Sequence, residues 1–103
     1  MIIYNTTFHA DDSVIDEFIK WLKQEYVPAA LSNGILIEPR LTRIFNHKED
    51  NQGQSYSLQF RTKSLEDLSR WYKMTGNILI ETIGKKFGNT VAGFSTLLEE
   101  MEL

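Results

Sequence analysis

Six segments with strand-like or helical hydrophobic spacing follow one another along this 103-residue chain, and their order constrains the fold more than any other feature. Strands alternate apolar and polar side chains, whereas helices repeat apolar residues every three or four positions. By these periods, the expected strands are 2–9, 35–46, 55–61 and 90–98, and the expected helices are 14–26 and 65–86. The order is therefore β-α-β-β-α-β, and residues 1–103 are expected to form one domain.

Proline and glycine residues predict irregularities inside four of these segments. Pro39 cannot donate a hydrogen bond to a neighbouring strand, so the second strand is expected at a sheet edge or with a bulge. Pro28 disfavours helical angles at Val27, so the first helix is expected to break or kink near residue 26. Gly76 predicts a distortion or a close packing contact in the second helix, and Gly93 predicts a bulge in the last strand.

Two β-α-β units of this kind share a four-stranded antiparallel sheet with strand order 4-1-3-2, an α+β arrangement called ferredoxin-like. Right-handed crossovers place both helices on one face of that sheet. The apolar residues of the first and third strands then pack under the helices; they include Tyr4, Phe8, Tyr56, Leu58 and Phe60. The opposite face of these two central strands is polar.

That second face is the candidate functional surface. It is predicted to carry Asn5, Thr7, His9, Ser57 and Gln59. Ile3 lies on the same face, and Leu97 is a further candidate for it. Either Arg40 or Arg43 joins from the second strand, according to the register at Pro39. Such a mixed surface suits packing against a second copy of the chain, with a polar ligand cavity between the sheets; an open, solvated face is the alternative.

Composition excludes several classes of function. Eleven basic and fourteen acidic residues give a net charge of −3 with no basic stripe, so no nucleic-acid partner is expected. The absence of cysteine rules out disulfides, thiolate nucleophiles and zinc ribbons. His9 and His47 lie far apart without a metal-ligand spacing, so no metal site is expected. The sequence shows no leader peptide or membrane span, so we expect a cytoplasmic protein that does not bind membranes.

Several spaced sequence segments resemble one family. They are MIIYNTTF at the start, WLKQEYVP at 21–28, SYSLQF followed by SLEDL, and FGNTVAGFSTLLEE near the end. Over essentially the whole chain, this pattern resembles the uncharacterised bacterial domain family DUF4286. The resemblance implies a ferredoxin-like domain akin to the dimeric α/β-barrel proteins, and it implies no activity because the family has none assigned. Tyr26 stands where the family often has histidine and Ser95 where it often has arginine, so neither position supports a shared catalytic role.

Trp71 in the second helix is a further site candidate. Asn5 on the first strand with a tryptophan on the second helix resembles the layout of cofactor-free and haem-degrading monooxygenases of the dimeric barrel class. The haem-degrading members also use a histidine of that helix as axial ligand, and the helix expected over 65–86 contains none. No haem or other cofactor is therefore expected, and packing or an interface is the simpler role for Trp71.

The leading hypothesis from the sequence is a homodimeric ferredoxin-like protein that binds a small polar or aromatic molecule between sheet and helices. Its candidate ligand-binding residues are Asn5, Thr7, His9, Ser57, Gln59 and Trp71. One alternative is a cofactor-independent oxygenase or isomerase in which Asn5, His9 and Gln59 orient the substrate. Another is a regulatory or interaction module whose polar sheet face binds a different protein. The sequence identifies neither a ligand nor a reaction.

Overall fold

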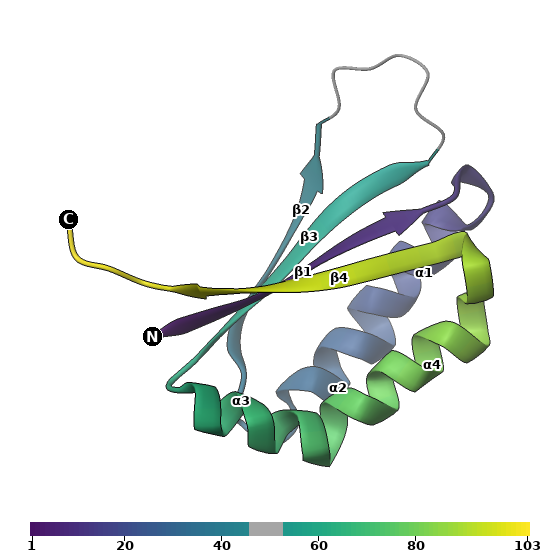
Figure 1. Cartoon of the computed structure of the whole chain (residues 1–103). Helices are drawn as coiled ribbons and strands as arrows, with labels where there is room; N and C mark the ends of the chain where they lie inside the picture. Colours follow the sequence, from purple (N-terminus) through teal and green to yellow (C-terminus); the bar gives the residue numbers. More distant parts are fainter. Residues whose placement is uncertain (46–52) are drawn as a thin grey trace.

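A four-stranded antiparallel sheet organises the computed structural model, which describes residues 1–45 and 53–103 (Figure 1). The strands are β1 (Ile2–Ala10), β2 (Ile37–Ile44), β3 (Gln54–Thr62) and β4 (Val91–Glu99). They lie in the order β2-β3-β1-β4. This is the predicted order 4-1-3-2 read from the opposite edge, so the ferredoxin-like topology is confirmed. Between the second and third strands the sequence predicts a polar, glycine-containing loop over residues 47–54, and residues 46–52 lie outside the described residues.

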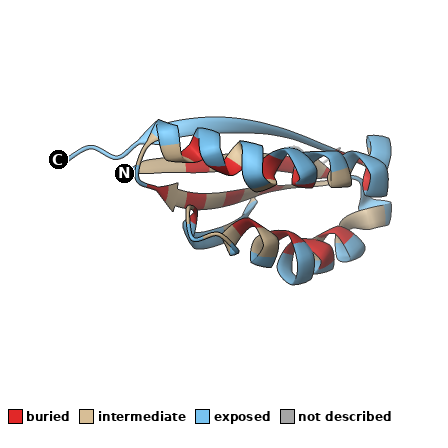
Figure 2. Cartoon of the chain, turned by 90° about the horizontal axis from the view of Figure 1, so that it is seen from below, coloured by how far each residue is buried: buried red, intermediate tan, exposed pale blue. Residues whose placement is uncertain are grey.

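Two long helical segments pack on one face of the sheet (Figure 2). The first consists of α1 (Ile15–Trp21), η2 (Leu22–Tyr26) and α2 (Val27–Leu31), and the second of α3 (Leu65–Trp71), η3 (Tyr72–Gly76) and α4 (Asn77–Phe87). Single 3₁₀ turns, η1 (Asp12–Val14) and η4 (Gly88–Thr90), flank them. At the start of α3, the Asp67 backbone N–H donates to the Ser64 hydroxyl at 3.1 Å, which caps the helix.

The first helical segment passes through Pro28 without a break. Val27 has helical angles, φ −62° and ψ −47°, so the prediction that it leaves the helical region was wrong. The preceding turn η2 is a π-helix, in which the Val27 N–H donates to the Leu22 carbonyl five residues earlier. We attribute the tolerance to this widened turn, because Pro28 can neither donate to a carbonyl four residues back nor fit closely against it.

The second helical segment has a matching π-turn at Gly76, where both a distortion and a packing contact were expected. A Cβ atom on Gly76 would lie 2.5 Å from Cζ3 of the Trp71 ring and 2.9 Å from the Tyr72 ring. Real Cβ atoms do not approach other atoms so closely, so the helix needs glycine here. The prediction is confirmed on both counts.

The two edge strands differ in regularity. In β2 the register shifts between Ile37 and Arg40, and Glu38 has a positive φ of 54°, which confirms an edge strand with a bulge at Pro39. In β4 the register runs unbroken past Gly93, so the bulge predicted there was wrong. Gly93 instead makes room for its cross-strand partner Phe8, since a Cβ would lie 3.0 Å from that ring.

An aromatic core fills the space between the sheet and the helices. Its largest fully buried side chains include Trp71, Tyr4, Tyr26, Phe18 and Phe60. The rings pack edge to face, for example Phe8 against Phe18 with centroids 5.2 Å apart. Along the central strands β1 and β3, buried residues alternate with half-buried ones, whereas β4 is exposed over nearly its whole length (Figure 2).

Candidate functional site

The sheet face that points away from the helices, here called the open face, carries a row of paired polar side chains. In the antiparallel register of β1 and β3, Asn5 lies opposite Gln59, Thr7 opposite Ser57, and His9 opposite Ser55. Residues directly opposite each other in a sheet project to the same side. The structure therefore brings five of the six predicted site residues together on one surface.

Hydrogen bonds fix most of this polar row. The Ser57 hydroxyl donates to Oδ1 of Asn5, and Nδ2 of Asn5 donates to Oγ1 of Thr7 at 3.3 Å. Nδ1 of His9 lies 3.0 Å from the Ser55 hydroxyl. Within residues 1–45 and 53–103, the Gln59 amide forms no side-chain hydrogen bond, although all of its neighbours in the row do. Gln59 is therefore the member of the row best placed to bind a further polar group.

The bulge in β2 decides which arginine joins the open face. Beyond the bulge, Arg40 pairs with Gln59, so its side chain projects to the open face. Arg43 pairs with the core residue Tyr56 and projects to the helix side. In the described part of the chain Arg40 has no ion-pair partner, so its charge is available to a ligand.

Next to Arg40 the open face is hollowed. This cavity of 480 Å³ is lined by Ile3, Glu38, Pro39, Arg40, Gln59, Phe60, Arg61 and Glu100. Arg61 contacts both Glu38 and Glu100, with 2.8 Å between its Nε and Oε1 of Glu100. The hydrogen bond from Arg61 lowers the pKa of the Glu100 carboxyl. Arg61 is thus paired with two carboxylates, and Arg40 is the cation of the hollow that has no ion-pair partner among the described residues.

Strand β4 adds an apolar margin to the polar row. Phe94 lies opposite Thr7 and Leu98 opposite Ile3, so all four share the open face. Leu97 lies opposite Tyr4 on the helix side, so the strand contributes Leu98 rather than the expected Leu97. Phe94 on this edge strand is 65% exposed, so a large aromatic side chain faces solvent beside the polar row.

Trp71 is not part of this surface. It is fully buried on the helix side, where its Nε1 donates to the Ala30 carbonyl at 2.9 Å. Its ring packs against Tyr4 with centroids 5.4 Å apart. Asn5 projects from the opposite side of β1, so the structure does not bring the suggested pair together. The position of Trp71 supports the packing role.

A cluster of tyrosines lies beside Trp71 in the core. Burial, followed by the neighbouring tyrosine hydroxyls, raises the pKa of Tyr26 above the ordinary tyrosine value. Burial and a hydrogen bond with Tyr4 likewise raise the pKa of Tyr72. Ser95, which bonds Thr6 at 3.2 Å, reaches the same cluster through Tyr72. At neutral pH these hydroxyls are protonated and act as hydrogen-bond donors rather than as bases.

Two further kinds of site are absent from the described residues. Across 1–45 and 53–103, no group of three or more histidine, aspartate and glutamate side chains is close enough to hold a metal ion. None of the helices in these ranges combines the length and the apolar character that crossing a membrane requires.

Comparisons with known proteins identify the family and the fold. The domain of unknown function DUF4286 matches residues 1–101, so the chain belongs to this family. No curated protein matches the chain.

Solved structures share its fold at low sequence identity. A protein described as of the ethyl tert-butyl ether d (EthD) family, from Bacillus halodurans, has a TM-score of 0.70 at 14% identity, covering 98% of this chain and 100% of that one. HapK from Hahella chejuensis gives 0.73 at 10% identity, with 98% and 93% covered. A dimeric ferredoxin-like protein from an uncultured marine organism gives 0.61 at 16% identity, with 99% and 97% covered. At these identities the likeness establishes the fold alone.

Proposed function

We propose that this member of the family is a homodimeric small-molecule-binding protein. Two copies pack through their open faces, and the polar row with Arg40 lines a ligand cavity between the two sheets. The observation that carries the proposal is the composition of the open face. A hydrogen-bonded polar centre around Asn5 and Ser57 lies beside exposed Phe94 and Leu98.

The apolar margin argues for a partner. Phe94 and Leu98 lie on the open face of β4, and Met101 and Leu103 extend the exposed apolar surface along the C-terminal residues. These residues leave the body of the molecule in an extended path (Figure 1). Contiguous exposed apolar side chains of this kind mark interaction surfaces. A second copy is the occupant that the structural neighbours favour, since one of them is described as a dimeric ferredoxin-like protein.

The area of the open face indicates how much of this face a stable dimer interface has to include. Strands lie about 4.8 Å apart and rise about 3.3 Å per residue, so the face projects roughly 19 Å by 30 Å, or about 570 Å². A stable interface buries about 800 Å² per partner. Because the projected face is no larger than one partner's share of such an interface, a dimer needs the whole face, including the β4 margin. A single charged residue in that margin is then enough to weaken it strongly.

The polar centre argues for a ligand rather than for a purely structural interface. A buried polar group costs free energy unless it forms hydrogen bonds. Gln59 and Arg40 have no such partner in the described part of the chain. Burying both in a dimer would be unfavourable unless water or a bound molecule satisfied them. The hollow of 480 Å³ beside them has the volume of a small-molecule site.

The oligomeric state is the first test. Size exclusion with light scattering, over a concentration series, is expected to show a dimer for the wild type and a monomer for Phe94→Glu. Ile78→Glu is the matched control, because Ile78 is 64% exposed on α4 and lies on the helix side. A monomeric wild type, or dissociation by the Ile78 variant but not the Phe94 variant, would contradict the proposal.

Ligand binding is tested separately on the dimer. Protein-observed NMR with a panel of small carboxylic acids, amides and phenols is expected to identify compounds that shift open-face resonances. Gln59→Ala is expected to weaken those compounds about tenfold or more, since it removes an open-face amide without breaking any hydrogen bond of the polar row. Unchanged affinity in both Gln59→Ala and Asn5→Ala would disprove the pocket while leaving the dimer standing.

A further inference from the structure

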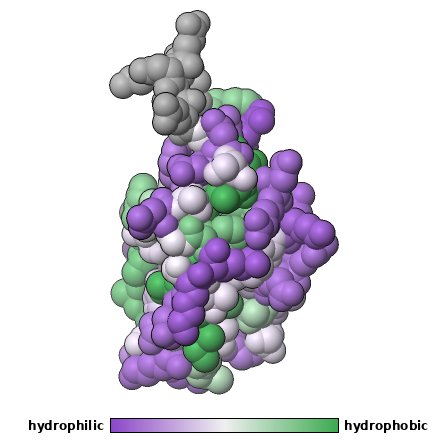
Figure 3. Space-filling view, turned by 90° about the vertical axis from the view of Figure 1, so that its right-hand side faces the viewer, coloured by the Kyte–Doolittle hydropathy of each residue, from purple (hydrophilic) through white to green (hydrophobic). Residues whose placement is uncertain are grey.

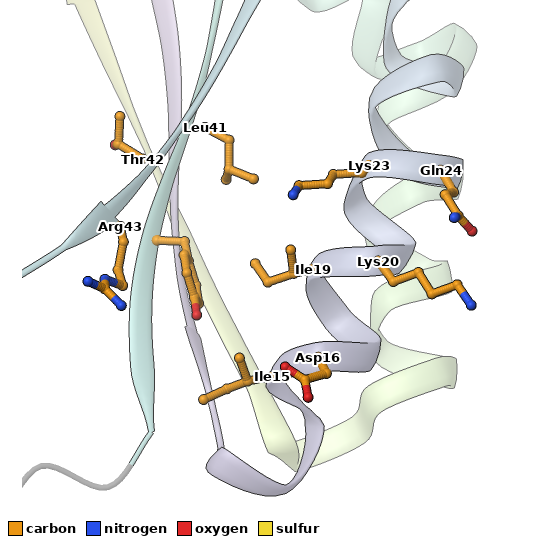
Figure 4. Close-up of a pocket in the computed structure, with 10 residues that line it drawn as sticks. Ile15, Asp16, Ile19, Lys20, Lys23, Gln24, Leu41, Thr42 and Arg43 are labelled. Atoms are coloured by element: carbon orange, nitrogen blue, oxygen red, sulfur yellow. The ribbon is translucent and has the colours of Figure 1, made fainter.

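A second groove lies on the helix side of the sheet, away from the open face. It has a volume of 650 Å³ and runs between the first helical segment and the neighbouring strands β2 and β3 (Figure 4). Its lining residues are Ile15, Asp16, Ile19, Lys20, Lys23, Gln24, Leu41, Thr42, Arg43 and Tyr56. We refer to it as the helix–sheet groove. It belongs to a single copy of the chain, so it does not depend on the proposed dimer.

The floor of the groove is apolar because helix α1 does not close over the edge strand. Ile15 and Ile19 project from α1 towards the strands, and Leu41 faces them from β2 (Figure 4). All three are only half-buried, although they pack against the core. Apolar side chains also reach the surface between hydrophilic ones on the side of the molecule shown in Figure 3. An apolar segment of a ligand on this floor would remove further surface from water.

The walls of the groove are positively charged. The lining contains three cations, Lys20, Lys23 and Arg43, and one carboxylate, Asp16, in a chain whose net charge is −3. Within the described ranges none of the three cations forms an ion pair. Lys23 extends from the helix towards the strands, Arg43 lies on the strand wall with its guanidinium turned away from the helix, and Lys20 points outwards (Figure 4). The groove therefore concentrates unpaired positive charge beside an apolar floor.

Tyr56 adds a hydrogen-bond donor to the groove. Its side chain lines the groove although the residue is only 8% exposed. Its hydroxyl has no hydrogen-bond partner among the described residues. In the described part of the chain the hydroxyl oxygen is not among the buried polar atoms that lack a partner, so it is accessible at the groove. A carboxylate in the groove would accept a hydrogen bond from it.

From these observations we propose that the helix–sheet groove binds a small amphipathic carboxylate. The aliphatic or aromatic body of the molecule lies on Ile15, Ile19 and Leu41. Its carboxylate pairs with Lys23 and accepts a hydrogen bond from Tyr56, and the exposed side chain of Arg43 supplies a second cation at the margin of the groove. Arginine presents a planar pair of donors that matches a carboxylate, and Arg43 is held over the Phe45 ring with its Cζ 5.2 Å from the centroid. The volume lies within the range of small-molecule sites.

Octanoate is the probe for the test, with octan-1-ol as its uncharged counterpart. Titration calorimetry is expected to show one octanoate per chain, and NMR is expected to show shifts of the Ile15 and Ile19 methyl groups. The double variant Lys23→Gln/Arg43→Gln is expected to weaken octanoate at least about tenfold, the effect of losing charge-assisted hydrogen bonds. Tyr56→Phe is expected to weaken it less. Lys85→Gln, on the exposed side of α4, is the matched control and is expected to bind normally.

Three results would overturn the proposal. They are no binding of octanoate, equal binding of octanoate and octanol, and unchanged affinity in the double variant. Tighter binding of a short acidic peptide than of octanoate would also overturn it, because the occupant would then be a protein segment. Phe94→Glu is expected to leave octanoate binding intact, so failure of the dimer and failure of this site are distinguishable.

Discussion

The two faces of the central strands follow the same backbone and carry opposite kinds of side chain. On the helix side, Tyr4, Phe8, Leu58 and Phe60 are almost completely buried among aromatic rings. On the open face, the polar row around Asn5 is only half-buried and is held by hydrogen bonds within the sheet. The first face provides most of the folding free energy, because burial of apolar area dominates it. The second face is free to determine what the protein binds.

The largest effect is expected from a core substitution. Trp71→Ala removes a fully buried indole and the hydrogen bond to Ala30, and should cost about 3–5 kcal/mol of unfolding free energy. Gln59→Ala on the open face should stay within about 0.5 kcal/mol. Urea denaturation followed by circular dichroism measures both. Similar losses of unfolding free energy for the two variants would contradict the conclusion that the helix side, and not the open face, provides most of the stability.

An intermediate effect is expected from the helix glycines. Gly76→Ala should destabilise the protein by about 1–3 kcal/mol, because the new methyl group overlaps the Trp71 ring. Gly84→Ala in α4 is the matched control, since a methyl group there would meet no described residue outside its own helix within 4 Å. That variant should stabilise by about 0.4–1 kcal/mol. Stabilisation by both substitutions would show that the core relaxes around the tryptophan more easily than its packing indicates.

The smallest effect at neutral pH, and the most selective, concerns Tyr26. Burial raises its pKa, so the folded protein holds this proton more tightly than the unfolded chain does. The free energy of unfolding that this protonated hydroxyl contributes is therefore fully present below about pH 10, the pKa of tyrosine in unfolded chains. It is lost as the pH rises above that value. Melting temperatures measured from pH 8 to 11 should fall less steeply for Tyr26→Phe than for the wild type. Parallel curves would place this hydroxyl in contact with water.

Much of the fold could be predicted because alternation of apolar and polar residues is visible in the sequence. The same alternation placed Asn5, Thr7 and Gln59 on one surface. It could not assign Arg40 and Arg43, because the bulge at Pro39 changes which residues of β2 share a side. Binding by the open-face residues stays a prediction.

Other features depend on distances that no local pattern contains. The helix–sheet groove exists because α1 does not cover the edge strand β2. A sequence does not show how far a helix lies from a strand. The sequence indicated only one part of this groove: side chains alternate along β2, which puts residues 41 and 43 on the same side of the strand. Packing or an interface was the simpler role predicted for Trp71, but its close contact with Gly76 could not be predicted, because the helix changes its hydrogen-bonding pattern directly after the tryptophan. Periodicity alone does not reveal such a turn.

The paired π-turns give the two halves of the molecule a common construction. In each half an α-helix of seven residues ends at a tryptophan, Trp21 or Trp71, and a five-residue π-turn follows. Each turn holds one residue more than a regular helix needs, and one residue corresponds to about 100° of rotation about the helix axis. Deleting a single residue from η3 would regularise the helix and rotate α4 until a different stripe met the sheet. The number of residues in each turn, more than their identity, therefore sets which side of the following helix becomes interior.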